Sequence, residues 1–145
     1  MTRILAVDPG DKRIGLAISD PSGSIANPLM VVEHVGRVID AARIAQTANE
    51  HEATLIVVGQ ALDAEGQVGP QARKAQRLAE AIKSQTNLEV VLWDESGSTQ
   101  IARRARIQMG GNRDKRKGHM DELAATVILQ SYLDYQNPIS RTMPE

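Results

Sequence analysis

The sequence contains no cysteine, and its only aromatic residues are Trp93, Tyr132 and Tyr135. The absence of cysteine excludes disulfides, thiolate catalysis and cysteine-ligated metals, and it fits a cytoplasmic protein. With so few aromatic rings, we do not expect a protein that binds single strands by stacking the bases on aromatic side chains.

Long apolar runs are also missing. No segment approaches the roughly 18 consecutive apolar residues of a membrane span, and charged residues interrupt every apolar run in residues 1–20, so a signal peptide is not expected. The net charge of −1 does not by itself favour nucleic acid. A chain of 145 residues that is 41% hydrophobic and 24% charged suits one domain. We expect that domain to span residues 1–138, with a frayed tail at 139–145.

Hydrophobic periodicity predicts the order of the secondary structure. Three short strands come first, at 3–8, 13–19 and 25–32, and Asn27-Pro28 favours an edge position for the third. Helices are predicted at about 35–49, 70–84, 98–108 and 120–135, with buried parallel strands at 54–59 and 88–93. The segment 109–119, which has adjacent glycines and a run of charges, is predicted to be a mobile loop. The fold class is therefore α/β: a five-stranded mixed sheet, made of an antiparallel three-strand meander plus two parallel strands, with helices on both faces.

Apolar residues at helical spacing mark the faces expected to be buried. They are Val35, Val38, Ile39, Ala42 and Ala45 in the first helix; Ala72, Ala75, Leu78, Ala79 and Ile82 in the second; and Leu123, Ala124, Val127, Ile128 and Leu133 in the last.

Acidic residues stand at the ends of two predicted strands and at the start of the last helix. Asp8 directly follows the buried run Ile4 to Val7, Asp94-Glu95 follow the fifth strand, and Asp121 opens the final helix. If the first and fifth strands run the same way, Asp8 and Glu95 lie at one edge of the sheet, where the helix start could add Asp121. Carboxylates this close repel one another unless a cation is present, and oxygen ligands favour Mg²⁺ or Mn²⁺, as one or two ions. Such a site suits the hydrolysis of phosphodiester bonds.

The same acidic residues also have structural interpretations. An acid in the first turn of a helix, such as Asp121, is common for capping alone. Asp8 is harder to explain in this way, because a carboxylate that ends a buried strand needs a partner. Asp20 ends the second strand at a turn and is interpreted as a turn residue.

The three histidines show no common ligand spacing. Structural or surface roles are expected for His34 and His51, whereas His119, close to Asp121, could touch a substrate. No elbow motif or paired base accompanies the serines, so a serine hydrolase is not expected.

Basic residues cluster in two places. One group leads directly into Asp121 and would place phosphate-binding side chains beside the proposed metal site. A second group lies on the outer face of the second predicted helix. The first group is Arg103, Arg104, Arg106, Arg113, Lys115, Arg116 and Lys117, and the second is Arg73, Lys74 and Arg77.

Four segments in the same order resemble the YqgF/RuvX family: "DPGDKRIGLAISD" (8–20), "IVVG" (56–59), "DESGST" (94–99) and "RKGHMDELAATVILQSYL" (116–133). Members resemble Holliday-junction resolvases, have a ribonuclease H-like fold and are regarded as nucleases that mature the end of the small-subunit ribosomal RNA precursor. The resemblance implies that Asp8, Glu95 and Asp121 are the catalytic, metal-binding set. It also implies a substrate-binding set made of Lys12, Arg13, Ser98, Thr99, Arg116 and Lys117. The implied partners are structured nucleic acid, either pre-ribosomal RNA or branched DNA, and the ribosome, for a monomer or homodimer.

The chain departs from the family pattern at two places. Ser96-Gly97 replace the usual Arg-Leu, and Gln60-Ala61-Leu62-Asp63 replace Leu-Pro-Leu-Asn. The leading hypothesis is a metal-dependent endonuclease. The departures motivate an alternative, a catalytically weak ribosome-assembly factor that binds nucleic acid, and a Holliday-junction resolvase acting on DNA is another. A nucleotide-binding enzyme of the actin-like, sugar-kinase group shares only residues 8–15, and such enzymes need two domains where this chain has room for one.

Overall fold

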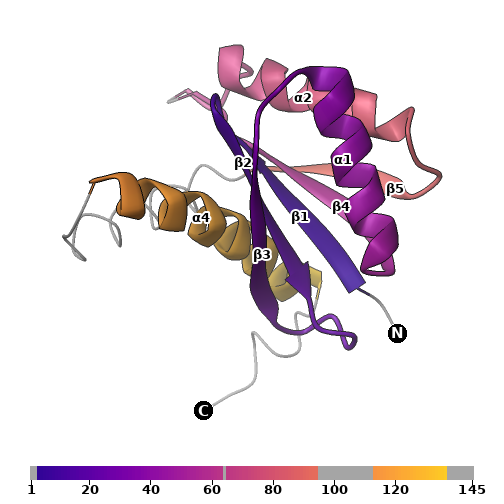
Figure 1. Ribbon diagram of the computed structural model, residues 1–145. Coiled ribbons are helices and arrows are strands. Elements are labelled where there is room, and N and C mark those ends of the chain that lie inside the picture. The colour runs from indigo at the N-terminus through magenta and orange to yellow at the C-terminus, as the bar shows by residue number, and fades with distance from the viewer. Residues whose placement is uncertain (1–2, 64, 95–112, 137–145) are drawn as a thin grey trace.

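The computed structural model describes residues 3–63, 65–94 and 113–136, and within the last of these ranges it describes the side chains from residue 123 onward. The described part forms one five-stranded mixed sheet of strand order β3-β2-β1-β4-β5 (Figure 1). β1 to β3 form an antiparallel meander, and β4 and β5 extend it in parallel with β1. The predicted sheet is therefore confirmed. Its elements are β1 (Arg3–Pro9), β2 (Arg13–Ser19), β3 (Ala26–Glu33), α1 (Arg37–Glu50), β4 (Ala53–Gln60), α2 (Pro70–Lys83), β5 (Glu89–Asp94) and α4 (Arg113–Gln136).

β3 lies at one edge of the sheet, as its proline predicted. Proline has no backbone N–H and is therefore tolerated only where a strand lacks a neighbour on one side. The β2–β3 pairing shifts register beside Pro28: Leu16 faces Met30, but Ala17 faces Pro28. A bulge therefore interrupts the edge strand at Leu29.

Helices cover both faces of the sheet, and the side chains of each strand alternate between them (Figure 1). On β1, Leu5 and Val7 pack in the cluster that includes α1 and α2. Ile4 and Ala6 pack on the other face, in the cluster that includes α4. The sheet is therefore the middle of three layers, with α1 and α2 on one face and α4 on the other.

α1 buries a different face from the one predicted. Of the five residues predicted to be buried, Ala45 is buried, but Val38 and Ile39 are 68% and 50% exposed, and Val35 and Ala42 are also exposed. Ile44, which was not predicted, is fully buried. Asp40 sets the orientation of the helix, because its carboxylate is buried and accepts a hydrogen bond from the backbone N–H of Val35 at 3.0 Å. The face next to Asp40 is lined by small residues that let the helix approach the sheet, whereas the more apolar face is left outside. The buried residues of α1 are Asp40, Ala41, Ile44, Ala45, Thr47 and Ala48.

α4 begins at Arg113, so the prediction of a loop at 109–119 was wrong for residues 113–119. Arginine and lysine are good helix formers, and a run of charges therefore does not by itself indicate a loop. Ala124, Ile128 and Leu133 are buried as predicted, whereas Leu123 and Val127 are half-buried. The predicted helix at 98–108, residues 109–112 and the tail at 139–145 lie outside the described residues. Across the described ranges, no helix combines the length and apolarity that a membrane crossing requires.

The second helix and the turn after β2 agree with their predictions. Ala72, Ala75, Leu78, Ala79 and Ile82 are all buried. The Asp20 carboxylate accepts hydrogen bonds from the backbone N–H groups of Ser24 and Ile25, at 2.8 and 3.0 Å, and from the hydroxyl of Ser22 at 2.6 Å. Asp20 is therefore a turn residue.

Two isoleucines on α1 test the orientation of this helix. Ile44→Ala removes a fully buried side chain, so we expect it to lower the free energy of unfolding by about 2–5 kcal/mol. Ile39→Ala makes the same chemical change at a half-exposed position and is expected to cost less than about 1 kcal/mol. Urea denaturation of both variants measures the difference. Equal losses would contradict the observed orientation.

The turn at Asp20 predicts a specific loss of stability in acid. Hydrogen bonds from Ile25, Ser22 and Ser24 lower the pKa of Asp20 from 3.8 to about 2. A carboxyl whose pKa is lower in the folded state stabilises the fold above its unfolded pKa, and this contribution is lost as the pH falls toward the folded pKa. We therefore expect the difference in stability between the wild type and Asp20→Asn to shrink between about pH 4 and pH 2. Denaturation at several pH values, together with carbon NMR of the carboxyl group, measures it. A midpoint near 3.8 would show that the turn does not hold the carboxylate.

Candidate active site

Asp8 lies near the carboxyl end of β1, at the edge where β4 and β5 also end. Both β1 and β5 run parallel to β4, so the predicted common direction of the first and fifth strands is confirmed. Because Ile4 and Ala6 face α4, the alternation along β1 directs Asp8 to the same side. The residue is half-buried. Asp8 is thus directed to the layer that contains α4 and Asp121.

Glycines flank Asp8 on both neighbouring strands. Gly15 of β2 pairs with Asp8 directly. On the other side Val7 pairs with Val58, so extending the register by one residue places Gly59 of β4 beside Asp8. A glycine within a strand often marks a place where a ligand approaches the backbone closely. No side chain of these two neighbours occupies the space beside the carboxylate.

Arg13 projects from the same side of the sheet. Ile14 and Leu16 of β2 face α1 and α2, so Arg13 alternates to the α4 side, two residues from Gly15. Its Nη1 atom is shielded from solvent and has no hydrogen-bond partner among the described residues. Buried donors are almost always paired, so an unpaired guanidinium nitrogen marks a position where an acceptor would be favourable.

Asp94, the other acid of the fifth-strand pair, does not face Asp8. It pairs with Gln60, and the side chain of Gln60 accepts a hydrogen bond from Gln76 of α2 at 3.3 Å. Asp94 therefore lies on the α2 side of the sheet, away from the α4 side to which Asp8 is directed.

The remaining predicted site residues are described only in part. Glu95, Ser98 and Thr99 lie outside the described residues. The backbone of α4 carries Arg116 and Lys117 in its first turns and Asp121 in its third, but the side chains of these residues, and that of His119, are not described. Among residues 3–63, 65–94 and 123–136, no group of three or more histidines and acids could hold a metal ion. The predicted carboxylate set therefore has one member, Asp8, whose side chain is described.

The turn between β1 and β2 is held in place by Lys74 of α2, a contact that the sequence did not predict. The Lys74 ammonium donates to the carbonyl oxygen of Gly10 at 3.1 Å and to Oδ1 of Asp11 at 2.7 Å. The hydrogen bond from Lys74 lowers the pKa of Asp11. A side chain at Gly10 would collide with the carbonyl oxygen of Arg13. Lys74 and the glycine together fix the short connection between Asp8 and the basic pair Lys12-Arg13.

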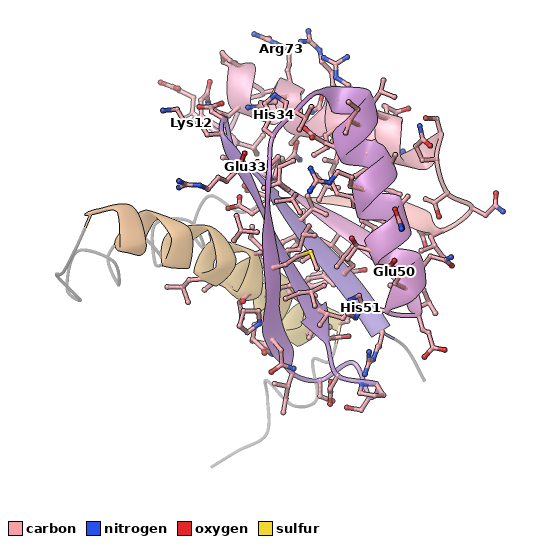
Figure 2. The ribbon with its side chains drawn as sticks, in the orientation of Figure 1. Lys12, Glu33, His34, Glu50, His51 and Arg73 are labelled. Atoms are coloured by element: carbon pink, nitrogen blue, oxygen red, sulfur yellow. The ribbon has the colours of Figure 1, made fainter. Side chains whose placement is uncertain are left out.

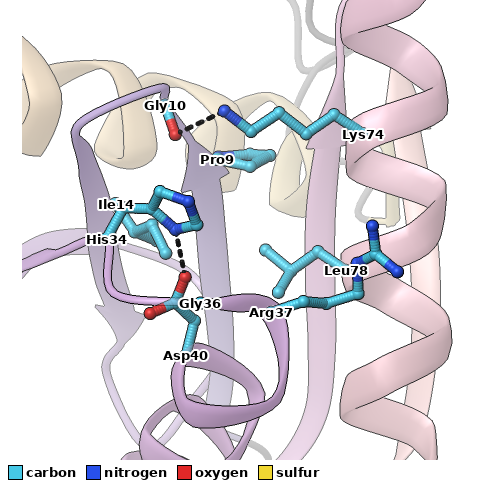
Figure 3. A pocket seen from close by; sticks show the side chains of 9 residues that line it. All are labelled: Pro9, Gly10, Ile14, His34, Gly36, Arg37, Asp40, Lys74 and Leu78. Carbon is cyan, nitrogen blue, oxygen red and sulfur yellow. Dashed lines mark hydrogen bonds and ion pairs between the residues drawn. The ribbon is translucent and has the colours of Figure 1, made fainter.

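His34 and Asp40 form a second pair at this end of the molecule (Figure 3). Nδ1 of His34 contacts Oδ2 of Asp40, and the backbone N–H of His34 donates to the carbonyl oxygen of Lys12 at 2.9 Å. The structural role expected for His34 agrees with these contacts. Both residues, together with Gly10, Arg37 and Lys74, line a pocket of about 230 Å³ on the side of α1 and α2. The one sequence signal for this pair was an acid, Asp40, within an apolar stretch of α1.

Comparison with solved structures identifies the fold. The chain superimposes on Thermus thermophilus RuvC in complex with a Holliday junction substrate with a TM-score of 0.57 at 15% identity, covering 94% of this chain and 96% of that one. It superimposes on the fowlpox virus Holliday junction resolvase with a TM-score of 0.56 at 14% identity, covering 93% and 99%. The predicted ribonuclease H-like fold is therefore confirmed.

Similarity in sequence extends over nearly the whole chain. A protein of Thermoanaerobacter pseudethanolicus is 43% identical over 135 residues, which cover 92% of this chain and 97% of that protein. A protein of Clostridium botulinum is 39% identical over 132 residues, covering 91% and 96%. Each is named "Putative pre-16S rRNA nuclease". The model of the RuvX family, described as Holliday junction resolvase, matches residues 2–135, and the chain therefore belongs to the RuvX family.

Proposed function

We propose that this chain is a divalent-metal-dependent endonuclease that hydrolyses phosphodiester bonds in structured nucleic acid, and that it matures the end of the small-subunit ribosomal RNA precursor. The observation that carries the proposal is the position of Asp8, at the carboxyl end of β1, directed toward α4 and flanked by two glycines. The nuclease class is supported by membership of the RuvX family, and the substrate by the names of relatives that match this chain over nearly its full length.

Asp8, Glu95 and Asp121 are the proposed metal ligands, for one or two Mg²⁺ or Mn²⁺ ions. Asp8 fits this role because its neighbours in the sheet, Gly15 and Gly59, leave room beside its carboxylate. Asp94 is directed to the other side of the sheet, which favours Glu95 as the ligand from the fifth-strand pair. A bound metal would activate water and stabilise the leaving oxygen.

The cationic residues near Asp8 are proposed to hold the phosphates. Arg13 lies on the same side of the sheet as Asp8, and its buried Nη1 has no acceptor among the described residues; a phosphate oxygen would supply one. Lys12 occupies the adjoining turn, which Lys74 and His34 hold in place. Ser98, Thr99, Arg116 and Lys117 complete the proposed substrate-binding set.

Resolution of Holliday junctions in DNA is the second candidate. It is favoured by the description of the matching family and by the similarity to RuvC. Similarity at 15% identity supports the fold alone, whereas the name of the relative that is 43% identical supports ribosomal RNA as the proposed substrate. If the reaction needs the arginine that Ser96-Gly97 replace in the family pattern, we expect this protein to bind nucleic acid without cutting it.

Cleavage assays test the proposal directly. Labelled ribosomal RNA precursor and four-way DNA junctions are each incubated with the wild type and with Asp8→Asn, in Mn²⁺, Mg²⁺ or EDTA. We expect cleavage of the RNA that requires metal and falls by more than about 100-fold in Asp8→Asn, because the variant loses a charged ligand oxygen. Asp94→Asn is the matched control, since this carboxylate lies on the other side of the sheet.

Each other outcome points to a different function. Cleavage of the junction alone would favour a resolvase, and binding of RNA without any cleavage would favour an assembly factor. Equal cleavage by the wild type and Asp8→Asn would exclude Asp8 from the site.

Substitution of Arg13 gives a separate prediction, because it should weaken the binding of RNA without lowering the stability of the protein. Arg13→Met removes a buried donor that has no partner in the described part of the chain, so we expect the melting temperature to stay constant or rise. The affinity for the RNA should fall about tenfold, since a charged phosphate contact is lost. Arg43→Met, on the exposed face of α1, is the control for loss of one charge. If Arg13→Met lowered stability and left affinity unchanged, Arg13 would be a structural residue.

A further inference from the structure

Four exposed cationic side chains surround one end of the molecule, on the side of α1 and α2. Lys12, His34 and Arg73 lie at this end, and Glu50 and His51 lie at the opposite one (Figure 2). Arg37 begins α1 and lines the same pocket as Lys74. Arg77 lies one turn beyond Arg73 on α2. We call the set Lys12, Arg37, Arg73 and Arg77 the basic rim.

Three acids near the basic rim already have other partners, whereas Glu33, which is exposed at the same end (Figure 2), forms no ion pair within the described part of the chain. Asp11 pairs with Lys74, and Asp40 pairs with His34. Asp63, near Gly69, accepts hydrogen bonds from the backbone of its own turn. Within the described part of the chain, no member of the basic rim forms an ion pair. The rim therefore carries four positive charges that no ion pair neutralises, against one exposed acid, Glu33, at the same end.

Part of the basic rim lies near the N-terminal ends of α1 and α2, where positive charge lowers the stability of a helix. α1 and α2 both begin at this edge, after Gly36 and Gly69, and neither has a side-chain cap. The N-terminal end of a helix carries partial positive charge and favours acids. α2 nevertheless has no acid in its first turn and places Arg73 and Lys74 in its first half, while α1 begins with Arg37 and has one acid, Asp40, in its first turn. Residues that oppose local stability in this way are expected at functional sites.

The basic rim is continuous with the candidate active site. Pro9 and Gly10 directly follow Asp8 and line the pocket shared with Arg37 and Lys74 (Figure 3). Asp8 itself is directed to the opposite face of the sheet. A nucleic-acid strand that crosses this edge of the sheet would therefore meet Asp8 on one side and the basic rim on the other.

We propose that the basic rim binds the sugar-phosphate backbone of the nucleic acid outside the segment that is cleaved. The identity of the ligand as nucleic acid rests on the proposed function. The rim holds phosphates by charge and has no aromatic residue among its four members, so it contributes affinity without base preference.

The test is the salt dependence of binding, measured in EDTA so that no cleavage occurs. Each phosphate contact contributes about 0.9 to the slope of log K against log salt for a duplex and about 0.7 for a single strand. Arg73→Gln/Arg77→Gln should therefore lower the magnitude of the slope by about 1.4–1.8. Arg43→Gln/Lys83→Gln removes the same amount of charge, one residue from α1 and one from α2, away from the rim, and is expected to change the slope by less than about 0.5.

The outcomes separate this inference from the proposed nuclease activity. A slope that falls equally in both double variants would overturn the rim as a binding surface, even if the protein cleaves RNA. A slope that falls only in Arg73→Gln/Arg77→Gln would support the rim, even if no cleavage were found. The melting temperature of this variant should stay constant or rise, since it removes the cation of Arg73 from the N-terminal half of α2; a fall would indicate a structural role for the two arginines.

Discussion

The position of Asp8 depends on the register of β1 between its two neighbours. β1 pairs antiparallel with β2 and parallel with β4, and both pairings fix which side chains face α4. Because side chains alternate along a strand, a shift of one residue would turn Asp8 toward α1 and α2 and bring Val7 to the α4 side. Such a shift would also remove Leu5 and Val7 from the apolar cluster that includes α1 and α2. The hydrophobic core and the orientation of the carboxylate are therefore maintained by the same pairing.

A second constraint acts on the turn that follows Asp8. Lys74 lies on α2, yet it holds the backbone of Gly10 and the side chain of Asp11. The basic residues Lys12 and Arg13 thus depend on a helix that belongs to a different part of the chain. The helix that positions this turn also carries Arg73 and Arg77. The turn beside Asp8 and the two arginines of the basic rim are therefore held by the same helix, α2.

Elements whose apolar residues recur with one clear helical or strand period could be predicted from the sequence. Features that depend on tertiary contacts could not. The buried face of α2 and the direction of β1, β4 and β5 follow from local patterns. The buried face of α1 does not, because the Asp40 carboxylate is buried through its contacts with the backbone of Val35 and the side chain of His34. Val38 and Ile39 are exposed as a result. The start of α4 was also missed, since its charged first turns resemble a loop in composition. The position of the candidate residue Asp8 could be predicted, because its carboxylate follows a buried apolar run in the sequence. The contact between Lys74 and Gly10 joins residues 64 positions apart and has no local signature.

The bulge and the proline in β3 have a consequence for self-association. An exposed edge strand presents unpaired backbone groups that can pair with a strand from another molecule. In β3, Pro28 lacks a donor and the bulge at Leu29 breaks the spacing of the groups that remain. These two features therefore disfavour in-register extension of the sheet by a second chain along this edge. At high local concentration, copies of the protein are thus protected, on the β3 side, from joining into a continuous intermolecular sheet.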